Sequence, residues 1–267
     1  MLETTPESHD LPGALWTLGK VSQVSKALLG HVCGASTLRR LLRAAGLSWK
    51  KVKKLLSRAD PAKRAEFLEH LRVLYDDMRS GRRTLIYIDE SHVHQDVDLG
   101  FGWAERGVPF RKATASPGLY SKINWYGAYN FTDGSVFTWA YPVFNGENTV
   151  DFLSKLAEEL RDKPRPTIVW DGAPAHRAKV ATAAAKEFGF EVIRLPGYSP
   201  DFNPIEGLWK WLREEVTNGQ YHKTLTNLFN ACKKFFARVN LDPLRLIQRL
   251  WPKFDLINEE ENLRQLT

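Results

Sequence analysis

The chain has 267 residues and a hydrophobic content of 43%, enough for one large domain, or for a large domain and a small one. Two cysteines, Cys33 and Cys232, show no Cys-x-x-Cys spacing, so they suggest neither a disulfide framework nor a zinc site and fit a reducing cytoplasm. The sequence has no apolar run near the roughly 20 residues of a membrane helix, and acidic residues stand where a signal peptide would be basic. We therefore expect a cytoplasmic protein outside the membrane.

Positive charge is concentrated at the N-terminal end of the chain. Residues 1–64 hold twelve Lys or Arg and four acidic residues, a net charge of +8. This is larger than the net charge of +7 of the whole chain. Clustered positive charge of this kind commonly faces nucleic acid.

The first elements are predicted to be two short helices. Residues 14–30 have apolar positions at helical spacing, Gly34 interrupts the pattern, and Ser36 or Thr37 is placed to cap a second helix that ends at Gly46. Leu38, Leu41, Leu42 and Ala45 would form the apolar stripe of that helix. Its basic residues, and those of the segment that follows, are Arg39, Arg40, Arg43, Lys50, Lys51, Lys53 and Lys54. The pair fits a DNA-binding helix-turn-helix, although a solvated helix with a basic face fits the same spacing.

A helix over 61–80 is expected to link this region to a sheet. The strand Thr84–Glu90 is apolar on both faces, as in a central strand covered on both sides. A short strand with turns is expected over Gly100 to Phe110. Two further strands, Ile123–Asn130 and Ser135–Phe144, are joined by a segment ending in Asp-Gly, which is a strong hairpin signal.

The remaining elements alternate between helix and strand. They are a helix at 148–162, a strand ending at Trp170, a helix at 175–188, a strand over Glu191–Leu195, a Pro/Gly-rich loop over Pro196–Pro204, a helix after that loop, a helix at 224–240, and a polar tail over 255–267. An antiparallel meander followed by alternating units predicts an α/β fold with a mixed sheet flanked by helices. The domain limits we predict are 1–58 for an all-α helix-turn-helix domain, 59–82 for the linking helix, 83–222 for the α/β domain and 223–267 for a helical extension.

Two of the predicted strands end in an aspartate, Asp89 and Asp171. If the strands are parallel neighbours, both carboxylates lie at the same edge of the sheet, where ligands usually bind. Two close carboxylates repel each other unless a cation neutralises them, and Mg²⁺ prefers such oxygen ligands. Each aspartate alone would also be an ordinary residue at a strand end or turn. Together they favour a divalent-metal site for phosphoryl chemistry.

Glu206 allows two interpretations. With Asn203 as N-cap and Pro204 in the first turn, Glu206 would serve only to cap a helix. Glu206, Lys210 and Arg213 also share one face of that helix. This arrangement suits a metal ligand with phosphate-contacting neighbours, and it suits an ordinary ladder of ion pairs.

Three segments resemble the catalytic core of a DDE transposase of the mariner-type superfamily, in its bacterial insertion-sequence branch. They are Ile86-Tyr87-Ile88-Asp89-Glu90, Val169 to His176, and Tyr198-Ser199-Pro200-Asp201-Phe202-Asn203-Pro204-Ile205-Glu206. The last is the most specific, and 34 residues separate Asp171 from Glu206, a spacing known from a major branch of the superfamily. The segment Gly102 to Gly107 adds to a resemblance that covers about residues 14–220.

The resemblance implies an RNase H-like fold in which Asp89, Asp171 and Glu206 are catalytic residues that bind two Mg²⁺ or Mn²⁺ ions. It implies cleavage of double-stranded DNA by water at transposon ends, then attack of the freed 3′-hydroxyl on target DNA, typically at TA, by a homodimer. Relatives usually carry two helix-turn-helix units where this chain has room for one, so we expect the other unit either to be encoded in a separate or frameshifted reading frame, as a partner, or to be lost. The resemblance leaves His176 either near the metals or in a structural role at a helix start.

Two other functions remain open on the sequence. A non-catalytic repressor derived from a transposase would use the basic N-terminal region alone, although it would have no need of the acidic triad. An RNase H-like nuclease would use the triad without recognising transposon ends.

Overall fold

The computed structural model describes residues 4–49 and 60–250, apart from 101, 103, 107–108, 110, 119, 174–175 and 177–178. The chain divides into two compact units, Met1–Leu55 and Leu56–Thr267, and each is described by itself. The predicted DNA-contacting lysines Lys50, Lys51, Lys53 and Lys54 and the polar tail over 255–267 lie outside the described residues.

The N-terminal unit contains the two predicted helices, preceded by a 3-10 turn, η1 (Pro6–His9). Helix α1 (Leu18–Leu29) begins at Thr17, whose side chain accepts a hydrogen bond from the Lys20 amide, and ends at Gly30. Helix α2 (Ala35–Ala44) begins at Gly34 without a side-chain cap, so the prediction of a Ser36 or Thr37 cap was wrong. Gly46, at a φ of 76°, confirms the predicted end of α2 because a left-handed residue closes its last turn.

Little apolar surface is buried within this unit. Its buried hydrophobic side chains include Val21, Val24 and Leu38, whereas Leu41 of the predicted apolar stripe is 54% exposed. The stripe was therefore only partly right, because Leu38 is buried and Leu42 half-buried, whereas Leu41 and Ala45 are exposed.

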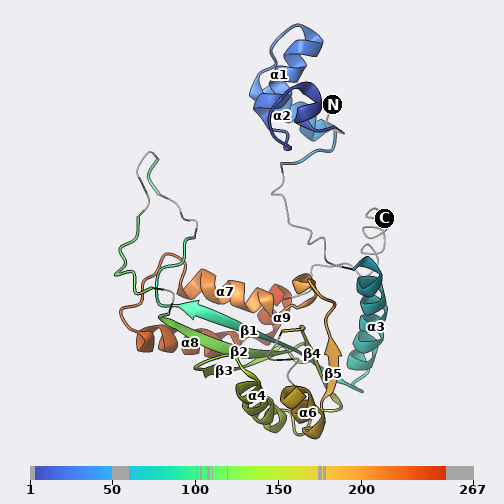
Figure 1. Ribbon diagram of the computed structural model, residues 1–267, viewed down its shortest axis with the longest axis vertical. Helices are drawn as coiled ribbons and strands as arrows, with labels where there is room; N and C mark the ends of the chain where they lie inside the picture. Colours follow the sequence, from blue (N-terminus) through green and yellow to red (C-terminus); the bar gives the residue numbers. More distant parts are fainter. Residues whose placement is uncertain are drawn as a thin grey trace. The chain divides into compact units, whose positions relative to one another are not determined.

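The second unit is built on a mixed sheet of five strands in the order β3-β2-β1-β4-β5 (Figure 1). Its strands are β1 (Thr84–His94), β2 (Lys122–Asn130), β3 (Ser135–Tyr141), β4 (Pro166–Trp170) and β5 (Glu191–Arg194). Strands β1, β2 and β3 pair antiparallel, and β4 and β5 run parallel to β1. The antiparallel meander followed by parallel strands confirms the sheet expected from the sequence.

Strand β1 is longer than predicted. It continues beyond Glu90 to His94 because β2 pairs with it along its length, whereas the parallel pairing with β4 covers only Thr84–Tyr87. The prediction that Asp89 ends a strand was therefore wrong. Strand β3 ends at Tyr141 and not at Phe144, and the described residues between Gly100 and Phe110 contain no strand.

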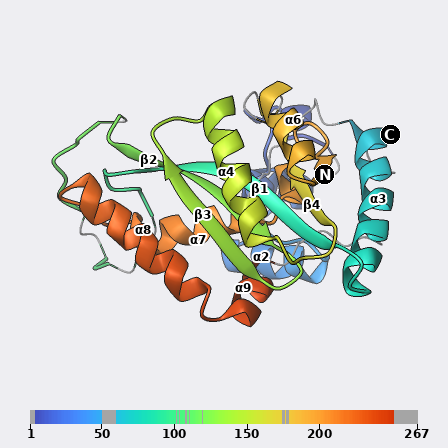
Figure 2. The same cartoon turned by 90° about the horizontal axis from the view of Figure 1, so that it is seen from below.

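Helices cover both faces of the sheet (Figures 1 and 2). Helices α4 (Gly146–Glu159) and α6 (Lys179–Glu187) lie side by side on one face, over a core that includes Ile86, Ile88 and Phe152. The opposite core is formed with α3 (Pro61–Arg79), α7 (Glu206–Val216), α8 (Leu225–Val239) and α9 (Pro243–Leu250). The sequence analysis did not anticipate α9. No helix in the described part of the chain combines the length and apolar character of a membrane span.

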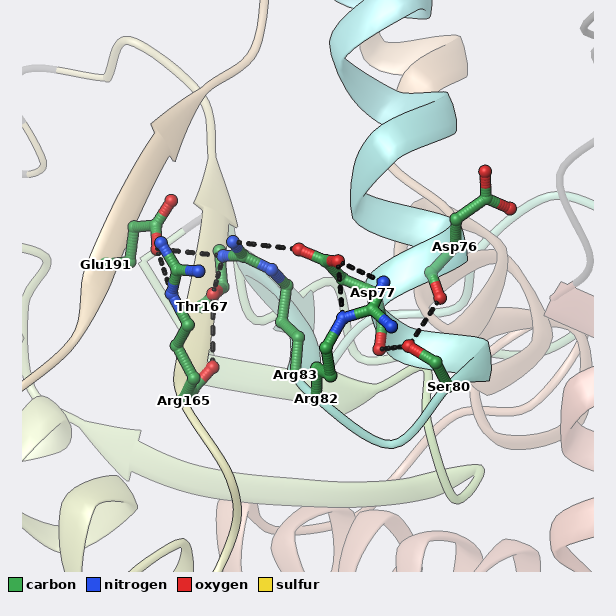
Figure 3. Close-up of polar contacts among 8 residues, drawn as sticks. All are labelled: Asp76, Asp77, Ser80, Arg82, Arg83, Arg165, Thr167 and Glu191. Carbon is green, nitrogen blue, oxygen red and sulfur yellow. Dashed lines mark hydrogen bonds and ion pairs between the residues drawn. The ribbon is translucent and has the colours of Figure 1, made fainter.

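Helix α3 does more than link two regions, because it packs its apolar face into the core of the second unit. Its buried side chains include Phe67, Leu68, Leu71, Leu74 and Tyr75. At its C-terminal end an ion-pair network joins it to the sheet (Figure 3). Arg83, 4% exposed, lies 2.5 Å from Thr167 Oγ1 on β4, 2.9 Å from Glu191 on β5 and 3.5 Å from Asp77 on α3.

Candidate active site

Alternate side chains of β1 face opposite sides of the sheet and therefore contact different helices. Tyr87 and Val93 belong to the core on the α7 side, and Ile86 and Ile88 to the core on the α4 and α6 side. Side chains alternate along a strand, so Asp89 points toward α7 and Glu90 toward the opposite face. A hydrogen bond of 2.9 Å from Trp209 Nε1 on α7 to Asp89 Oδ2 agrees with this orientation.

Asp171 lies level with Asp89 although the two strands differ in length. In the parallel pairing, Thr84 stands opposite Pro166 and Tyr87 opposite Val169. The same register continued by two residues places Asp171, the residue after β4, beside Asp89. The structure therefore brings the two aspartates to the place where β4 ends and β1 continues.

Glu206 is the first residue of α7, and the loop before it is held by α3 and by β1. Asp201 accepts two hydrogen bonds from the Arg64 guanidinium on α3, at 3.1 and 2.7 Å. The guanidinium carbon of Arg64 lies 4.0 Å from the centre of the Phe202 ring, and Phe67 stacks on that ring at 5.4 Å. These contacts fix the loop to the first two turns of α3.

Asn203 has a different role from the one predicted. Its side chain makes no cap at the start of α7. Instead Asn203 Nδ2 donates to the carbonyl of Ile88, the residue before Asp89, at 3.3 Å. The interpretation of Asn203 as an N-cap was therefore wrong, and this asparagine joins the loop before Glu206 directly to β1.

The three carboxylates influence one another electrostatically. Burial raises the pKa of Asp89 well above its usual value, and the charges of Glu206, Glu90 and Asp171 raise it further, against the hydrogen bond from Trp209. Burial also raises the pKa of Glu206, with Arg213 lowering it and Asp171 raising it. Neighbouring carboxylates thus make Asp89 and Glu206 harder to ionise, and a bound cation would relieve this repulsion.

The chemistry of this donor set fits a hard divalent cation. Carboxylate oxygens are the ligands that Mg²⁺ prefers, and besides burial the neighbouring carboxylates raise the pKa values of Asp89 and Glu206. Within the described residues, no three His, Cys, Asp or Glu side chains are arranged to hold a metal ion as they stand.

His176 lies between Asp171 and Glu90. It is 1% exposed, its Nδ1 is 2.9 Å from Asp171 Oδ1, and its Nε2 is 2.7 Å from Glu90 Oε1. Its ring stacks on Trp170 with centroids 4.7 Å apart. Burial alone would lower the pKa of His176, but the two carboxylates raise it to about 10. Of the two roles considered for His176, its position favours one next to the acidic site.

The predicted DNA-contacting residues fall into distinct settings. Arg39, Arg40 and Arg43 are exposed on α2, as expected. On α7, Lys210 is exposed and lies 3.8 Å from Glu214, whereas Arg213 donates to Ser91 Oγ on β1 at 2.7 Å. Of the two interpretations of Glu206, Lys210 and Arg213, the ladder of ion pairs is not favoured, because Lys210 pairs with Glu214 and Arg213 binds Ser91, although the charge of Arg213 still lowers the pKa of Glu206.

Sequence reasoning missed Trp209 as a neighbour of the site. It was assigned to the buried face of its helix, and it is indeed 1% exposed. The alternation of β1 could have identified the face that Asp89 shares with α7, but not which buried side chain of that helix carries a donor.

Two family models match the chain. One, described as DDE superfamily endonuclease, matches residues 84–229, and one described as winged helix-turn helix matches residues 12–71. A curated relative is the insertion element IS630 uncharacterized 39 kDa protein of Shigella sonnei. It is 24% identical over 244 residues, which cover 91% of this chain and 70% of the relative.

Two solved structures share the fold. The Mos1 strand transfer complex matches with a TM-score of 0.66 and 18% identity, over 94% of this chain and 74% of that one. A mariner Mos1 paired end complex with Mg matches with a TM-score of 0.64 and 17% identity, over 95% and 80%. This likeness confirms the expected RNase H-like fold.

Proposed function

This chain belongs to the DDE superfamily of endonucleases, in the group of mariner and IS630 transposases, and we propose that it moves its own element. It would cut DNA at the inverted-repeat ends and join the freed 3′-hydroxyl to target DNA, typically at TA. The observation that carries this proposal is the position of Asp89 and Asp171 at one level of the sheet, electrostatically coupled to Glu206 at the start of α7.

Asp89, Asp171 and Glu206 are the residues that would hold the metal. Two Mg²⁺ or Mn²⁺ ions would supply Lewis-acid stabilisation of the attacking and leaving oxygens of an in-line phosphoryl transfer. A Mos1 complex with Mg among the structural neighbours supports the choice of ion. The chain's own contribution is to position the carboxylates, with Asp89 on the paired strand β1 and Glu206 at the start of α7, after a loop anchored by Arg64 and Asn203.

DNA recognition is assigned to the N-terminal unit. Its match to a winged helix-turn-helix family and the exposed arginines of α2 support this assignment. We propose Arg39, Arg40, Arg43 and Lys210 as phosphate contacts among the described residues, with the lysines at 50, 51, 53 and 54 as further contacts. Arg213, which donates a hydrogen bond to Ser91 on β1, would act beside the site. The division after Leu55 supports the proposed domain limit near residue 58.

The proposed assembly is a homodimer on double-stranded DNA in a bacterial cytoplasm. The paired end complex of the mariner Mos1 transposase among the structural neighbours supports the dimer. A separately encoded helix-turn-helix unit remains a predicted partner.

The test is cleavage of DNA that carries the element's own ends. Asp89→Ala, Asp171→Ala and Glu206→Ala should each abolish Mn²⁺-dependent nicking and leave DNA binding in place. Asp151→Ala is the matched control, since Asp151 is an exposed carboxylate on α4 paired with Lys155. Unchanged cleavage in Asp89→Ala and Asp171→Ala would show that the site is assigned wrongly.

The same assay separates the two other functions. A salt-dependent gel shift without nicking under Mn²⁺, even with the product of an upstream reading frame added, would favour a repressor. Nicking with no preference for inverted-repeat ends would favour an RNase H-like nuclease.

A further inference from the structure

The loop between β5 and α7 holds a tyrosine in a strained backbone conformation. Tyr198 has a φ of 61°, in the left-handed region that a bulky side chain rarely adopts. Glycine or asparagine fills such a position at lower cost. A glycine stands directly before it, at Gly197, which is not itself in that region. The sequence therefore places an aromatic side chain where a smaller residue would suit the backbone better.

The loop around Tyr198 is anchored on both sides, which keeps the strained conformation in place. Before it, the Leu195 amide donates to the carbonyl of Trp170 at 2.9 Å. After it, Asn203 Nδ2 donates to the carbonyl of Ile88 at 3.3 Å. Strain of this kind persists only where the surrounding structure over-determines it, and it is concentrated at functional sites.

Tyr198 lies at the surface, unlike its neighbours in the loop. It is 50% exposed, whereas Ser199 and Phe202 are 3% and 0% exposed. Burial of the tyrosine within the protein therefore does not account for the strain. A partner outside the chain would account for it, because a half-exposed aromatic ring still has a face to offer.

The position of Tyr198 indicates what that partner is. Trp170, whose carbonyl binds the Leu195 amide, directly precedes Asp171. Tyr198 follows Leu195 by three residues, which span at most about 11 Å of extended chain. The same loop leads on to Glu206 at the start of α7. A DNA strand with its phosphate at the carboxylates would thus pass beside this tyrosine.

We propose that Tyr198 binds DNA by stacking its ring on the base next to the scissile phosphate. This inference rests on the proposed DNA-cleaving function. A base that leaves the duplex loses its stacking neighbours, and an aromatic side chain replaces them. Such stacking contributes about 1–3 kcal/mol per base, which corresponds to roughly 5- to 150-fold in binding. The anchored loop holds the tyrosine backbone in place before DNA binds, so less ordering is needed on binding.

The test is Mn²⁺-dependent nicking by the full chain of DNA that carries the element's own ends, measured as kcat/KM. Tyr198→Asn removes the ring and suits the left-handed backbone. It should lower kcat/KM about tenfold because stacking is lost, without lowering the melting temperature because strain is relieved. Tyr198→Phe keeps the ring and should retain the wild-type value.

Abasic DNA shows whether the tyrosine acts through a base. Duplexes that each lack one base of the cleaved strand, at successive positions on both sides of the scissile phosphate, are compared with intact DNA. At the stacked position, the difference in kcat/KM between the wild type and Tyr198→Asn should disappear, since neither chain has a base to stack there. At the other positions the difference should persist.

Arg165→Asn is the matched control for the relief of backbone strain. Arg165 has a φ of 37° and directly precedes β4, at the opposite end of that strand from Asp171. This variant should nick intact and abasic DNA as the wild type does. A wild-type kcat/KM in Tyr198→Asn, or a loss that persists with every abasic duplex, would overturn the inference. Absence of nicking by the wild-type chain would instead refute the proposed function.

Discussion

Replacing Arg64 with alanine should loosen the loop that carries Glu206, although Arg64 belongs to a helix that contributes no carboxylate to the site. Arg64 binds Asp201 through two hydrogen bonds and covers the ring of Phe202. Both partners precede Glu206 by a few residues. The change therefore tests whether α3 holds the third carboxylate in place.

The size of the effect follows from the exposure of the groups. The side chain of Arg64 is 11% exposed and that of Asp201 is 51% exposed, so solvent screens the pair and its contribution is about 1 kcal/mol. The guanidinium over the buried Phe202 ring adds about 1 kcal/mol. Together these give about 2 kcal/mol, which corresponds to roughly a 30-fold increase in local opening.

Hydrogen exchange measures that opening directly. The amides of Phe202, Asn203 and Glu206 each donate to a carbonyl within the loop, so their protection should fall by roughly 30-fold in Arg64→Ala. Arg72→Ala is the control, since Arg72 lies on the same helix and pairs with Glu69 three residues before it. Protection of the loop should be unchanged in that variant.

A double-mutant cycle with Asp201→Asn isolates the pair from the packing on Phe202. The coupling energy should be about 1 kcal/mol, because the two side chains interact directly. Loop protection in Arg64→Ala that equals the wild type, or a coupling energy near zero, would refute the reasoning.

Three further results are expected. Because the folded-state pKa values of Asp89 and Glu206 are raised, the metal-free chain should lose stability as pH rises from the ordinary carboxyl range through those values. The rise in melting temperature on adding Mn²⁺ should accordingly be larger at about pH 8 than at about pH 5. Arg83→Ala should destabilise the chain by about 2 kcal/mol in denaturant unfolding, since it removes a buried guanidinium that binds Thr167 and Glu191, although Asp77 and Glu191 keep Arg82 and Arg165 as partners. Arg82→Ala, where the side chain is 64% exposed, should change the stability by less than about 1 kcal/mol. Arg43→Gln should lower the salt slope of DNA binding by about one, and an unchanged slope would remove Arg43 from the interface.

The sequence predicted the elements of the second unit well because their signals are local. Strand-like apolar runs and an Asp-Gly turn identify β2 and β3, and helical spacing identifies α7 and α8. The end of β1 was misjudged since it depends on pairing with a distant strand, which no local pattern encodes. Helix α9 has only eight residues, so its apolar spacing spans too few turns to stand out.

The carboxylates of the site could be predicted from the sequence, but the contacts that orient them could not. Asp89, Asp171 and Glu206 stand out by their positions after apolar runs and in a specific segment. The contacts that orient them come from side chains far away in sequence, such as Arg64 and Trp209, whose own segments read as ordinary helices. The capping interpretation of Asn203 failed for the same reason, because its partner is the carbonyl of Ile88 on β1.

The unequal lengths of β1 and β4 give the three carboxylates unequal freedom. The backbone at Asp89 is held in the ladder with β2, opposite Gly127, and cannot shift without breaking the sheet. Asp171 follows the last residue of β4, and Glu206 opens a helix, so neither backbone is held in a strand ladder. Strand β1 thus supplies the one carboxylate of the three whose backbone is locked into the sheet.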